Sequence, residues 1–241
     1  MPEYLVKFVS RSGAASRRGA ADRIKSGQVA VNGQTVLDPA CMVDPAHDEV
    51  VCAGKLLHAP DDSEKVYLML HKPRGYTTSH RDRHASKLAV ELIDLAVAGK
   101  LVSAGRLDRD SEGLLIFSND GDFINRLAHP RYGLTKRYLA TADRELSREA
   151  RQKMVDGMVD QGELLRADAV TPGPAPRTYH VELHEGKKRE VRRLLKACGA
   201  QTLRLVRLSL GPVELGELAP GRWRKLTPAE VTALCRAAEE V

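Results

Sequence analysis

The sequence predicts an α+β protein made of a small N-terminal part and a larger second part. Both parts mix two kinds of pattern: short apolar or alternating runs that indicate strands, and apolar residues at helical spacing. A polar stretch that contains a proline lies between the parts. A chain of 241 residues is long enough for a small domain followed by a medium one.

The first part is predicted to hold a helix followed by a hairpin. Ser16 can cap a helix over residues 17–26, whose apolar positions fall on one face, and Gly27 marks its end. Two apolar runs, 29–31 and 36–37, flank an Asn-Gly pair, which is the strongest short hairpin signal. Basic residues gather on and around the helix, although a solvated helix face would give the same pattern.

The segment from Ala59 to Lys65 is polar, charged and interrupted by Pro60, which is typical of a linker. We therefore expect a domain at residues 1–60, a linker at 61–65 and a second domain at 66–241. In chain order, the second domain is predicted to contain a buried strand from Val66, a turn at 72–75, a helical pattern at 88–98, a helix at 122–129 ended by Pro130, a strand at 136–140, a helix capped by Ser147, a loop at 171–176, a strand at 177–182, an amphipathic helix at 188–198 and a final helix opened by the capping box at 227–230.

The segment 101–121 contains acidic and basic side chains of the kinds that act in catalysis. Asp108 stands between two arginines in a charged stretch with an apolar run on each side, which predicts a loop between two strands. The acids match the first half of a calcium loop, but Asn119 replaces the bidentate Glu and excludes an EF-hand. No glycine-rich phosphate cradle or Walker lysine is present in the sequence. An exposed ion pair between Asp108 and its arginine neighbours would explain the cluster equally well.

The helix at 188–198 has an apolar face and a basic face. Its apolar positions recur at helical spacing, and Arg189, Arg192, Arg193 and Lys196 recur at the same spacing on the other side. Four cations stacked on one helix face repel one another unless an anion or an acidic side chain lies close enough to neutralise them. Phosphates or Asp108 itself are the obvious partners.

The composition points to a polyanionic partner. The net charge is +6 and the isoelectric point is about 9.2, while aromatic residues make up only 4% of the chain and leave few stacking platforms. No apolar run approaches membrane-spanning length and the first residues lack a signal-peptide core, so we expect a cytoplasmic protein without membrane contact. The four cysteines are scattered without metal-ligand spacing, so we expect reduced thiols and no metal site.

Several motifs match one known family. The segment GAASRRGAADRIKSGQVAVNGQTV resembles the S4 RNA-binding domain, most specifically through Ser16-Arg17-Arg18, Gly27 and Val31-Asn32-Gly33. The remaining matches are HKPRG (71–75), GRLDRDSEGLLIFSNDG (105–121), Lys136-x-Tyr138, EGKKREVRRLLKACG (185–199) and the tail from 205 to 227. Together they resemble the S4-containing pseudouridine synthases of bacterial ribosomal RNA. Glu190, where other members carry Gln, favours the branch that acts on large-subunit RNA.

The resemblance implies a fold and a set of site residues. The expected fold is an S4-like domain followed by a catalytic domain with a mixed, mostly antiparallel sheet. Asp108 would be the catalytic aspartate, Arg192 its ion-pair partner and Tyr138 the residue that stacks on the target uracil. Arg106 would touch phosphate or fill the space left by the extruded base, and Leu205 would line the base pocket. The residues expected to contact RNA are Arg11, Ser16, Arg17, Arg18, Lys25, Lys72, Arg189 and Arg193.

The resemblance also implies the reaction, which is the isomerisation of uridine to pseudouridine in ribosomal RNA or in a ribosome-assembly particle. It further implies that the protein acts as a monomer and needs neither a metal nor an organic cofactor. The carboxylate could attack C1′, stabilise positive charge there, or remove a sugar proton to give a glycal, and the sequence leaves all three open. Two other interpretations stay open: a non-catalytic RNA-binding or ribosome-assembly factor on the same fold, and a glycosidase that releases free uracil.

Overall fold

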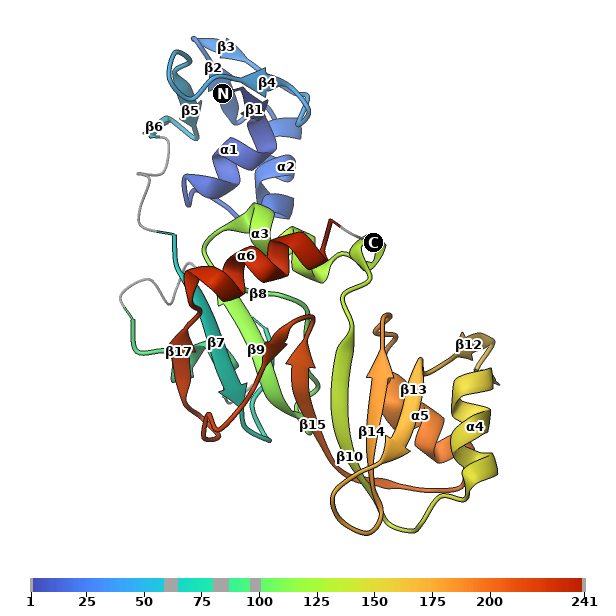
Figure 1. Cartoon of the computed structure of the whole chain (residues 1–241). Helices are drawn as coiled ribbons and strands as arrows, with labels where there is room; N and C mark the ends of the chain where they lie inside the picture. The colour runs from blue at the N-terminus through green and yellow to red at the C-terminus, as the bar shows by residue number, and fades with distance from the viewer. Residues whose placement is uncertain (1, 59–64, 80–86, 96–100, 240–241) are drawn as a thin grey trace. The chain divides into compact units, whose positions relative to one another are not determined.

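The computed structural model describes residues 2–58, 65–79, 87–95 and 101–239, and these divide into two compact units, Met1–Glu64 and Lys65–Val241 (Figure 1). The predicted linker at 61–65 lies almost entirely outside the described residues, as does the end of the predicted helix at 88–98.

The first unit packs two helices against short strands. Its elements are β1 (Glu3–Tyr4), α1 (Leu5–Arg11), α2 (Arg17–Lys25), β2 (Val29–Val31), β3 (Gln34–Thr35), β4 (Met42–Val43), β5 (Val50–Cys52) and β6 (Lys55–Leu57). The hydroxyl of Ser16 accepts the Gly19 N–H at 3.2 Å, so the predicted helix cap is confirmed. The predicted hairpin is also confirmed, since Asn32 and Gly33 have φ of 51° and 78°, but its second strand is β3 rather than residues 36–37.

The second unit is built on one large sheet. Its elements are β7 (Tyr67–Lys72), η1 (Ala89–Leu92), β8 (Val102–Ser103), β9 (Glu112–Ser118), α3 (Gly121–Ala128), η3 (Pro130–Tyr132), β10 (Lys136–Ala142), α4 (Arg148–Asp156), β11 (Met158–Asp160), β12 (Glu163–Leu165), β13 (Ala169–Pro172), β14 (Thr178–Leu183), α5 (Glu190–Ala197), β15 (Thr202–Leu210), β16 (Val213–Glu214), β17 (Trp223–Lys225) and α6 (Pro228–Ala237). The nine-stranded sheet runs β13-β14-β10-β15-β9-β7-β17, with β16 on β15 and β8 on β9. Among the described strands, β9 and β15 form the parallel pair and the other pairs are antiparallel, which confirms the mixed, mostly antiparallel sheet.

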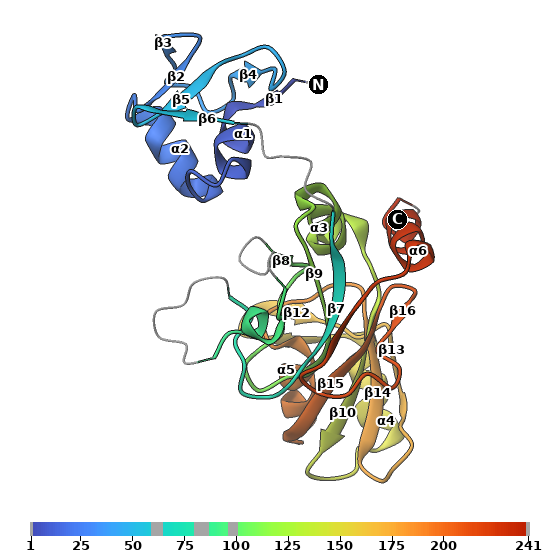
Figure 2. The ribbon, with the colours of Figure 1, turned by 90° about the vertical axis from the view of Figure 1, so that its left-hand side faces the viewer.

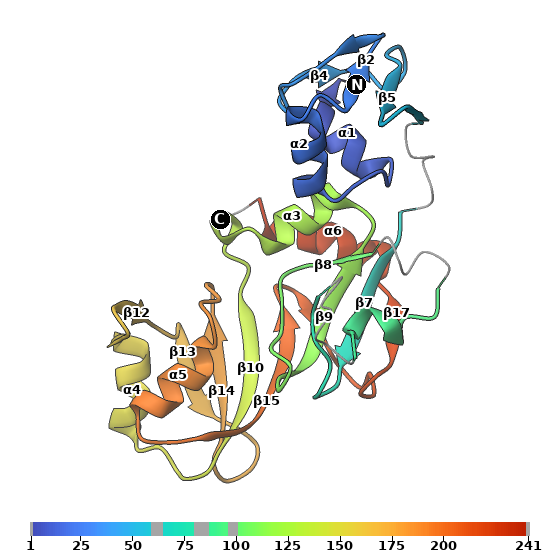
Figure 3. The same cartoon turned by 180° about the vertical axis from the view of Figure 1, so that it is seen from behind.

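Both faces of this sheet are buried, because its central strands are apolar on both sides. On β9, Leu115 and Phe117 enter one core while Leu114 and Ile116 enter the other. Helices α4 and α5 cover the first core, and α3 and α6 lie side by side over the second (Figures 2 and 3). We call the first of these cores, which contains Tyr138, the α5-side core.

Two segments differ from the sequence-based expectation. Within residues 88–95 the structure has a single 3-10 turn, η1 (Ala89–Leu92), rather than a helix, because Glu91 accepts the Leu88 N–H to close the turn and Ile93 is already extended. The predicted loop at 171–176 begins later, because β13 includes Pro172 as its last residue. A proline can end an edge strand, and here the Gly173 N–H makes the next hydrogen bond, to the Thr178 carbonyl.

The parallel pair between β9 and β15 is short and very close. It comprises Val206 opposite Glu112 and Arg207 opposite Gly113. Gly113 has φ of 109°, and a Cβ at this position would lie 2.5 Å from the Arg207 main-chain nitrogen and closer still to its carbonyl oxygen. Only glycine fits such a backbone approach, and this glycine lies five residues after Asp108.

Replacement of Gly113 by alanine should therefore destabilise the second unit by about 2 kcal/mol or more, because the neighbouring group that must move is main chain. Urea unfolding followed by fluorescence of Trp223, the single tryptophan, would measure this. The matched control is Gly121→Ala, since Gly121 begins α3 and its Cβ would have no atom within 4 Å. Equal stability of Gly113→Ala and the wild type would contradict the close approach.

Candidate active site

Asp108 lies in the loop between β8 and β9. Leu107 before it is buried in the α5-side core, whereas the Asp108 side chain is 37% exposed, so the loop is anchored while the carboxylate is accessible. The Oδ2 atom of Asp108 lies 3.5 Å from Nη1 of Arg189. Arg106 is exposed on the same loop. The loop thus presents an accessible carboxylate with a guanidinium beside it.

Hydrogen bonds from the segment after β7 fix the backbone of this loop. The buried hydroxyl of Thr78 accepts the Leu107 N–H at 3.3 Å and donates to the Leu107 carbonyl at 3.0 Å. The Gly75 N–H donates to the Arg109 carbonyl at 2.7 Å, and Arg109 Nε returns a bond to the Gly75 carbonyl at 3.3 Å. The residues on both sides of Asp108 are therefore held by the same neighbouring segment.

Lys72 is a structural residue in this arrangement. It is fully buried, and its Nζ donates to the carbonyls of Ser111 at 2.6 Å and Pro73 at 3.1 Å. Burial lowers the pKa of Lys72 to about 8. The predicted contact of Lys72 with RNA is wrong, because the side chain does not reach the surface. It instead holds the backbone three residues after Asp108.

Asp110 is the carboxylate on which two arginines converge. Arg189 donates to both Asp110 oxygens at 3.1 and 3.0 Å. Arg192 Nη2 lies 3.3 Å from Asp110 Oδ2 and donates to the Asp110 carbonyl at 2.9 Å. In the described structure the ion pair of Asp108 is thus with Arg189, and the expected pair with Arg192 is replaced by one to Asp110. Arg189 precedes α5 in the left-handed conformation, with φ of 55°, so it does not follow the helical spacing of the predicted basic face.

Arg193 faces other carboxylates. Its guanidinium bonds Asp160 and Glu163, which lie on the β11 and β12 hairpin, and its side chain is only 16% exposed. Two acids of the same chain thus already neutralise Arg193, and its contact with RNA stays a prediction. Arg189 and Lys196 are the exposed members of the basic face, and Arg189 bonds Asp110. The basic face of this helix is therefore neutralised mainly by acidic side chains of the same chain.

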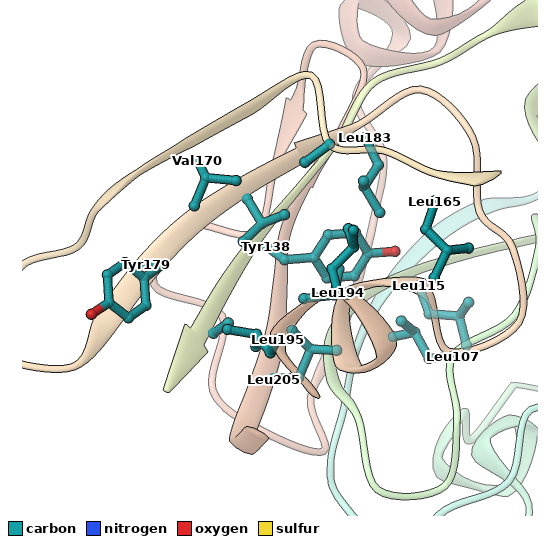
Figure 4. Close-up of a cluster of buried hydrophobic side chains, with 14 of the residues drawn as sticks. Leu107, Leu115, Tyr138, Leu165, Val170, Tyr179, Leu183, Leu194, Leu195 and Leu205 are labelled. Atoms are coloured by element: carbon teal, nitrogen blue, oxygen red, sulfur yellow. The ribbon is translucent and has the colours of Figure 1, made fainter. Parts of the chain in front are cut away.

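Tyr138 and Leu205 belong to the α5-side core. Tyr138 lies on β10 and Leu205 on β15, and they are 8% and 5% exposed. In the register of the two strands, Tyr138 lies opposite Arg207 and Leu205 lies opposite Ala140. The side chain of Tyr138 points toward the side of the core that holds Leu107 (Figure 4). Apolar packing therefore connects Tyr138 with the residue that precedes Asp108.

Two residues near the site were not predicted. Thr78 holds Leu107, but a single hydroxyl after a turn has no distinctive pattern in the sequence. Arg207 is 2% exposed, and its Nε donates to the Leu114 carbonyl at 2.7 Å. A signal for Arg207 did exist, because it lies within the apolar run LRLVRLSL, where a strand buried on both faces would bury a charge.

In the first unit, the predicted RNA-binding residues differ in their surroundings. Arg17, Arg18 and Lys25 are exposed on α2. Arg11 pairs with Glu3 at 2.9 Å, and the Ser16 hydroxyl is used in the helix cap. Of these predicted residues, the three cations that remain without an assigned role, Arg17, Arg18 and Lys25, therefore lie on α2.

The described residues contain neither a metal-binding cluster nor a membrane-spanning helix. The four cysteines, all described, are free thiols. No group of His, Cys, Asp and Glu within the described ranges could hold a metal ion. Across the same ranges, no helix combines the length and apolar character that a membrane span requires.

Comparison with known proteins gives two family matches. Residues 66–197 match the family described as RNA pseudouridylate synthase, and residues 5–50 match the S4 domain. A solved structure described as a pseudouridylate synthase superposes with a TM-score of 0.69 at 28% identity, over 96% of this chain and 99% of that one.

Relatives in several bacteria carry related names. An uncharacterised RNA pseudouridine synthase of Mycobacterium leprae is 39% identical over 72% of this chain and 70% of its own length. The ribosomal small subunit pseudouridine synthase A of Pasteurella multocida is 35% identical over 76% of this chain and 79% of its own length. The ribosomal large subunit pseudouridine synthase B of Pseudomonas aeruginosa is 32% identical over 78% of this chain but only 51% of its own length.

Because Asp110 is ion-paired in the folded state, the free energy of unfolding should depend on pH. Burial alone would raise the pKa of Asp110, but the hydrogen bonds from Arg189 and the charge of Arg192 outweigh it and hold this pKa below its ordinary value. A lowered pKa adds stability above the pKa of the unfolded carboxyl, about 4, and this stability is lost as the pH falls below it. Asp110→Asn should therefore be less stable by about 1 kcal/mol at pH 7, and the difference should shrink below about pH 4.

Urea unfolding followed by Trp223 fluorescence between about pH 7 and pH 3 would measure this difference. The control is Asp156→Asn, an exposed carboxylate on α4 that accepts a hydrogen bond from Gln152. A stability gap for Asp110→Asn that stays constant over this whole range would contradict the ionic role of Asp110.

Proposed function

The chain belongs to the RNA pseudouridylate synthase family, and we propose that it isomerises uridine to pseudouridine in ribosomal RNA with Asp108 as the catalytic carboxylate. The family match covers more than half of the chain and includes the loop of Asp108. Ribosomal RNA is the proposed substrate because the names of two relatives refer to ribosomal subunits. The reaction is an intramolecular transfer that needs neither an oxidant nor net hydrolysis.

The observation that carries this proposal is the accessible Asp108 carboxylate on a loop with a fixed backbone. The isomerisation breaks the bond between N1 and C1′ and joins C1′ to C5 of the same uracil. An ionised carboxylate can attack C1′, stabilise positive charge on it or take a sugar proton. The Arg189 guanidinium, 3.5 Å away, gives the ionised form a partner. Lys72, Thr78 and Arg192 would keep the loop in place while the substrate changes around it.

The other site residues receive complementary roles. Tyr138 would stack on the target uracil, and Leu205 would line the apolar part of the base pocket. Arg106, exposed beside Asp108, would touch phosphate or fill the space of the base that leaves its stack. Arg192 would act through Asp110 as a positioning residue, and Arg189 would be the ion-pair partner of Asp108.

The first unit would hold RNA through α2. Arg17, Arg18 and Lys25 are exposed there, and exposed cations on one helix suit contacts to phosphates. In this proposal residues 1–60 bind RNA, 61–65 are a linker, and 66–241 perform the chemistry. The protein would act as a monomer in the cytoplasm, on RNA or on a ribosome-assembly particle. Pseudouridine mapping in both subunit RNAs, with and without the protein, would identify the target and test the preference for the large subunit.

Asp108→Asn should lower the rate of pseudouridine formation by at least about 10³-fold, because asparagine has the size of aspartate but lacks the charged group that the reaction needs. RNA affinity should change little. Single-turnover assays and a separate binding measurement would give the two quantities, and Asp168→Asn, which changes a carboxylate paired with His184, would serve as the control.

Full activity of Asp108→Asn would refute the catalytic assignment. A wild type that binds ribosomal RNA without isomerising it would instead favour a non-catalytic RNA-binding factor, and release of free uracil would identify a glycosidase.

Joint replacement of Arg17 and Arg18 by alanine should weaken RNA binding and reduce its salt dependence. For each phosphate that the variant no longer neutralises, the slope of log affinity against log salt should become shallower by roughly 0.7 to 0.9. Filter binding at several salt concentrations would measure this. A double variant of Arg126 and Arg144, two exposed arginines of the second unit, removes the same charge and should change the slope less. Identical slopes for both double variants would contradict a specific role of α2.

A further inference from the structure

Arg207 is a buried cation that the proposed chemistry has not used. It lies on β15 and is 2% exposed. Its Nε donates to the Leu114 carbonyl, but its Nη2 is buried without a hydrogen-bond partner among the described residues. A buried guanidinium that lacks a partner for one of its N–H groups is costly, so it indicates either a ligand or a water at that atom.

The parallel ladder between β9 and β15 ends at Arg207. The parallel register contains only Glu112 and Gly113 of β9, and β15 continues by pairing with β16. Arg207 thus lies where the two strands part, and its Nε satisfies the Leu114 carbonyl beyond the end of the ladder. Its partner in the register, Gly113, follows Asp108 by only five residues.

Arg207 faces the same side of the sheet as the proposed base pocket. Residues of β15 alternate between the two cores, with Leu205 in the α5-side core and Val206 in the other. Alternation puts Arg207 on the side of Leu205. In the register with β10, Arg207 lies opposite Tyr138, the residue proposed to stack on the uracil.

A second cation lies near it on the same side. Lys136 precedes Tyr138 by two residues on β10, and its Nζ donates to the Leu134 and His184 carbonyls at 2.9 and 2.8 Å. Burial, together with the charge of Arg207, lowers the pKa of Lys136 to about 8. The interaction means that the two cations share one region of the core, beside Tyr138.

The isomerisation creates a negative charge on the uracil that such cations would stabilise. When the N1 to C1′ bond breaks, the electron pair stays with the uracil, which becomes an anion whose charge spreads over N1, O2 and O4. C1′ then carries the Asp108 ester, a positive charge or the glycal double bond. After the base turns, C5 attacks C1′, the proton on C5 leaves to a base, and N1 gains a proton; in the glycal route the sugar proton taken by Asp108 also returns to C2′. The detached uracil is an anion in every one of these routes.

We propose that Arg207 donates its Nη2 hydrogen bond to a carbonyl oxygen of the detached uracil and stabilises the negative charge of this intermediate. The inference rests on the proposed function. A donor that is already in place and shielded from water stabilises a developing anion far more than an exposed one does. The nearby Lys136 adds positive potential from the same side.

The test compares two bases that differ in acidity. In 5-fluorouridine, the fluorine withdraws electrons, so the detached base needs less help to carry its charge. Arg207→Gln should lower the single-turnover rate on a uridine-containing RNA on the order of 100-fold, and the reduction on the same RNA with 5-fluorouridine should be markedly smaller. Consumption of the target nucleoside, measured by digestion and mass spectrometry, is the readout. Arg207→Lys keeps the charge and should recover part of the rate on uridine.

The matched control is Arg204→Gln. Arg204 lies three residues earlier on β15 and pairs with Glu112 at the same strand junction, so its replacement weakens the junction without removing the charge beside Tyr138. It should leave the ratio of the two rates at the wild-type value. A ratio that Arg207→Gln also leaves unchanged would overturn the inference and make Arg207 a structural residue. If Arg207→Gln fails to fold, Arg207→Met, which also removes the charge and the donor, takes its place in the same comparison.

A wild type that consumes neither nucleoside would instead refute the proposed function itself. The two failures are therefore distinguishable, because only the second removes activity from the unaltered protein.

Discussion

The contact between Gly113 and Arg207 joins the two halves of the large sheet, and the position of Asp108 depends on it. One half contains β7 and β9, and the other contains β10, β14 and β15. The loop of Asp108 comes from the first half, whereas Tyr138 and Leu205 come from the second. Main-chain atoms that approach this closely leave little freedom to shift one half along the other. The relative placement of carboxylate and aromatic ring is thus fixed mainly by backbone.

Around this junction, the exposed Arg204 pairs with the Glu112 carboxylate, whereas three other cations hold main-chain oxygens. Lys72 bonds the Ser111 carbonyl, Lys136 bonds the His184 carbonyl, and Arg207 bonds the Leu114 carbonyl. A buried cation bound to neutral oxygens retains more of its positive potential than one in an ion pair, although burial makes it easier to deprotonate. The region behind Asp108 and Tyr138 is accordingly rich in positive charge. The arginines of α5 differ, since Asp110, Asp160 and Glu163 neutralise them.

Local signals in the sequence predicted much of the fold. Ser16, Ser147 and the box opened by Thr227 cap helices as expected, because a cap depends on three or four adjacent residues. The sequence motif also led to Asp108, which the structure presents on an accessible loop. The partners of the α5 arginines did not follow from helical spacing, because the left-handed conformation of Arg189 redirects one side chain. Burial of Lys72 depends on Ser111, 39 residues later, and no local pattern reports it.

The division into two units has a consequence for how RNA would arrive. Met1–Glu64 contains more Asp and Glu than Lys and Arg, so the net positive charge of the chain comes from Lys65–Val241. Long-range attraction of a polyanion, which speeds diffusional encounter, would therefore come from the larger unit. In the proposed function, the small unit would act only at short range, through the cations of α2. Capture would precede alignment: the larger unit would draw RNA in from solution, and the helix of the smaller one would then select the orientation in which it stays.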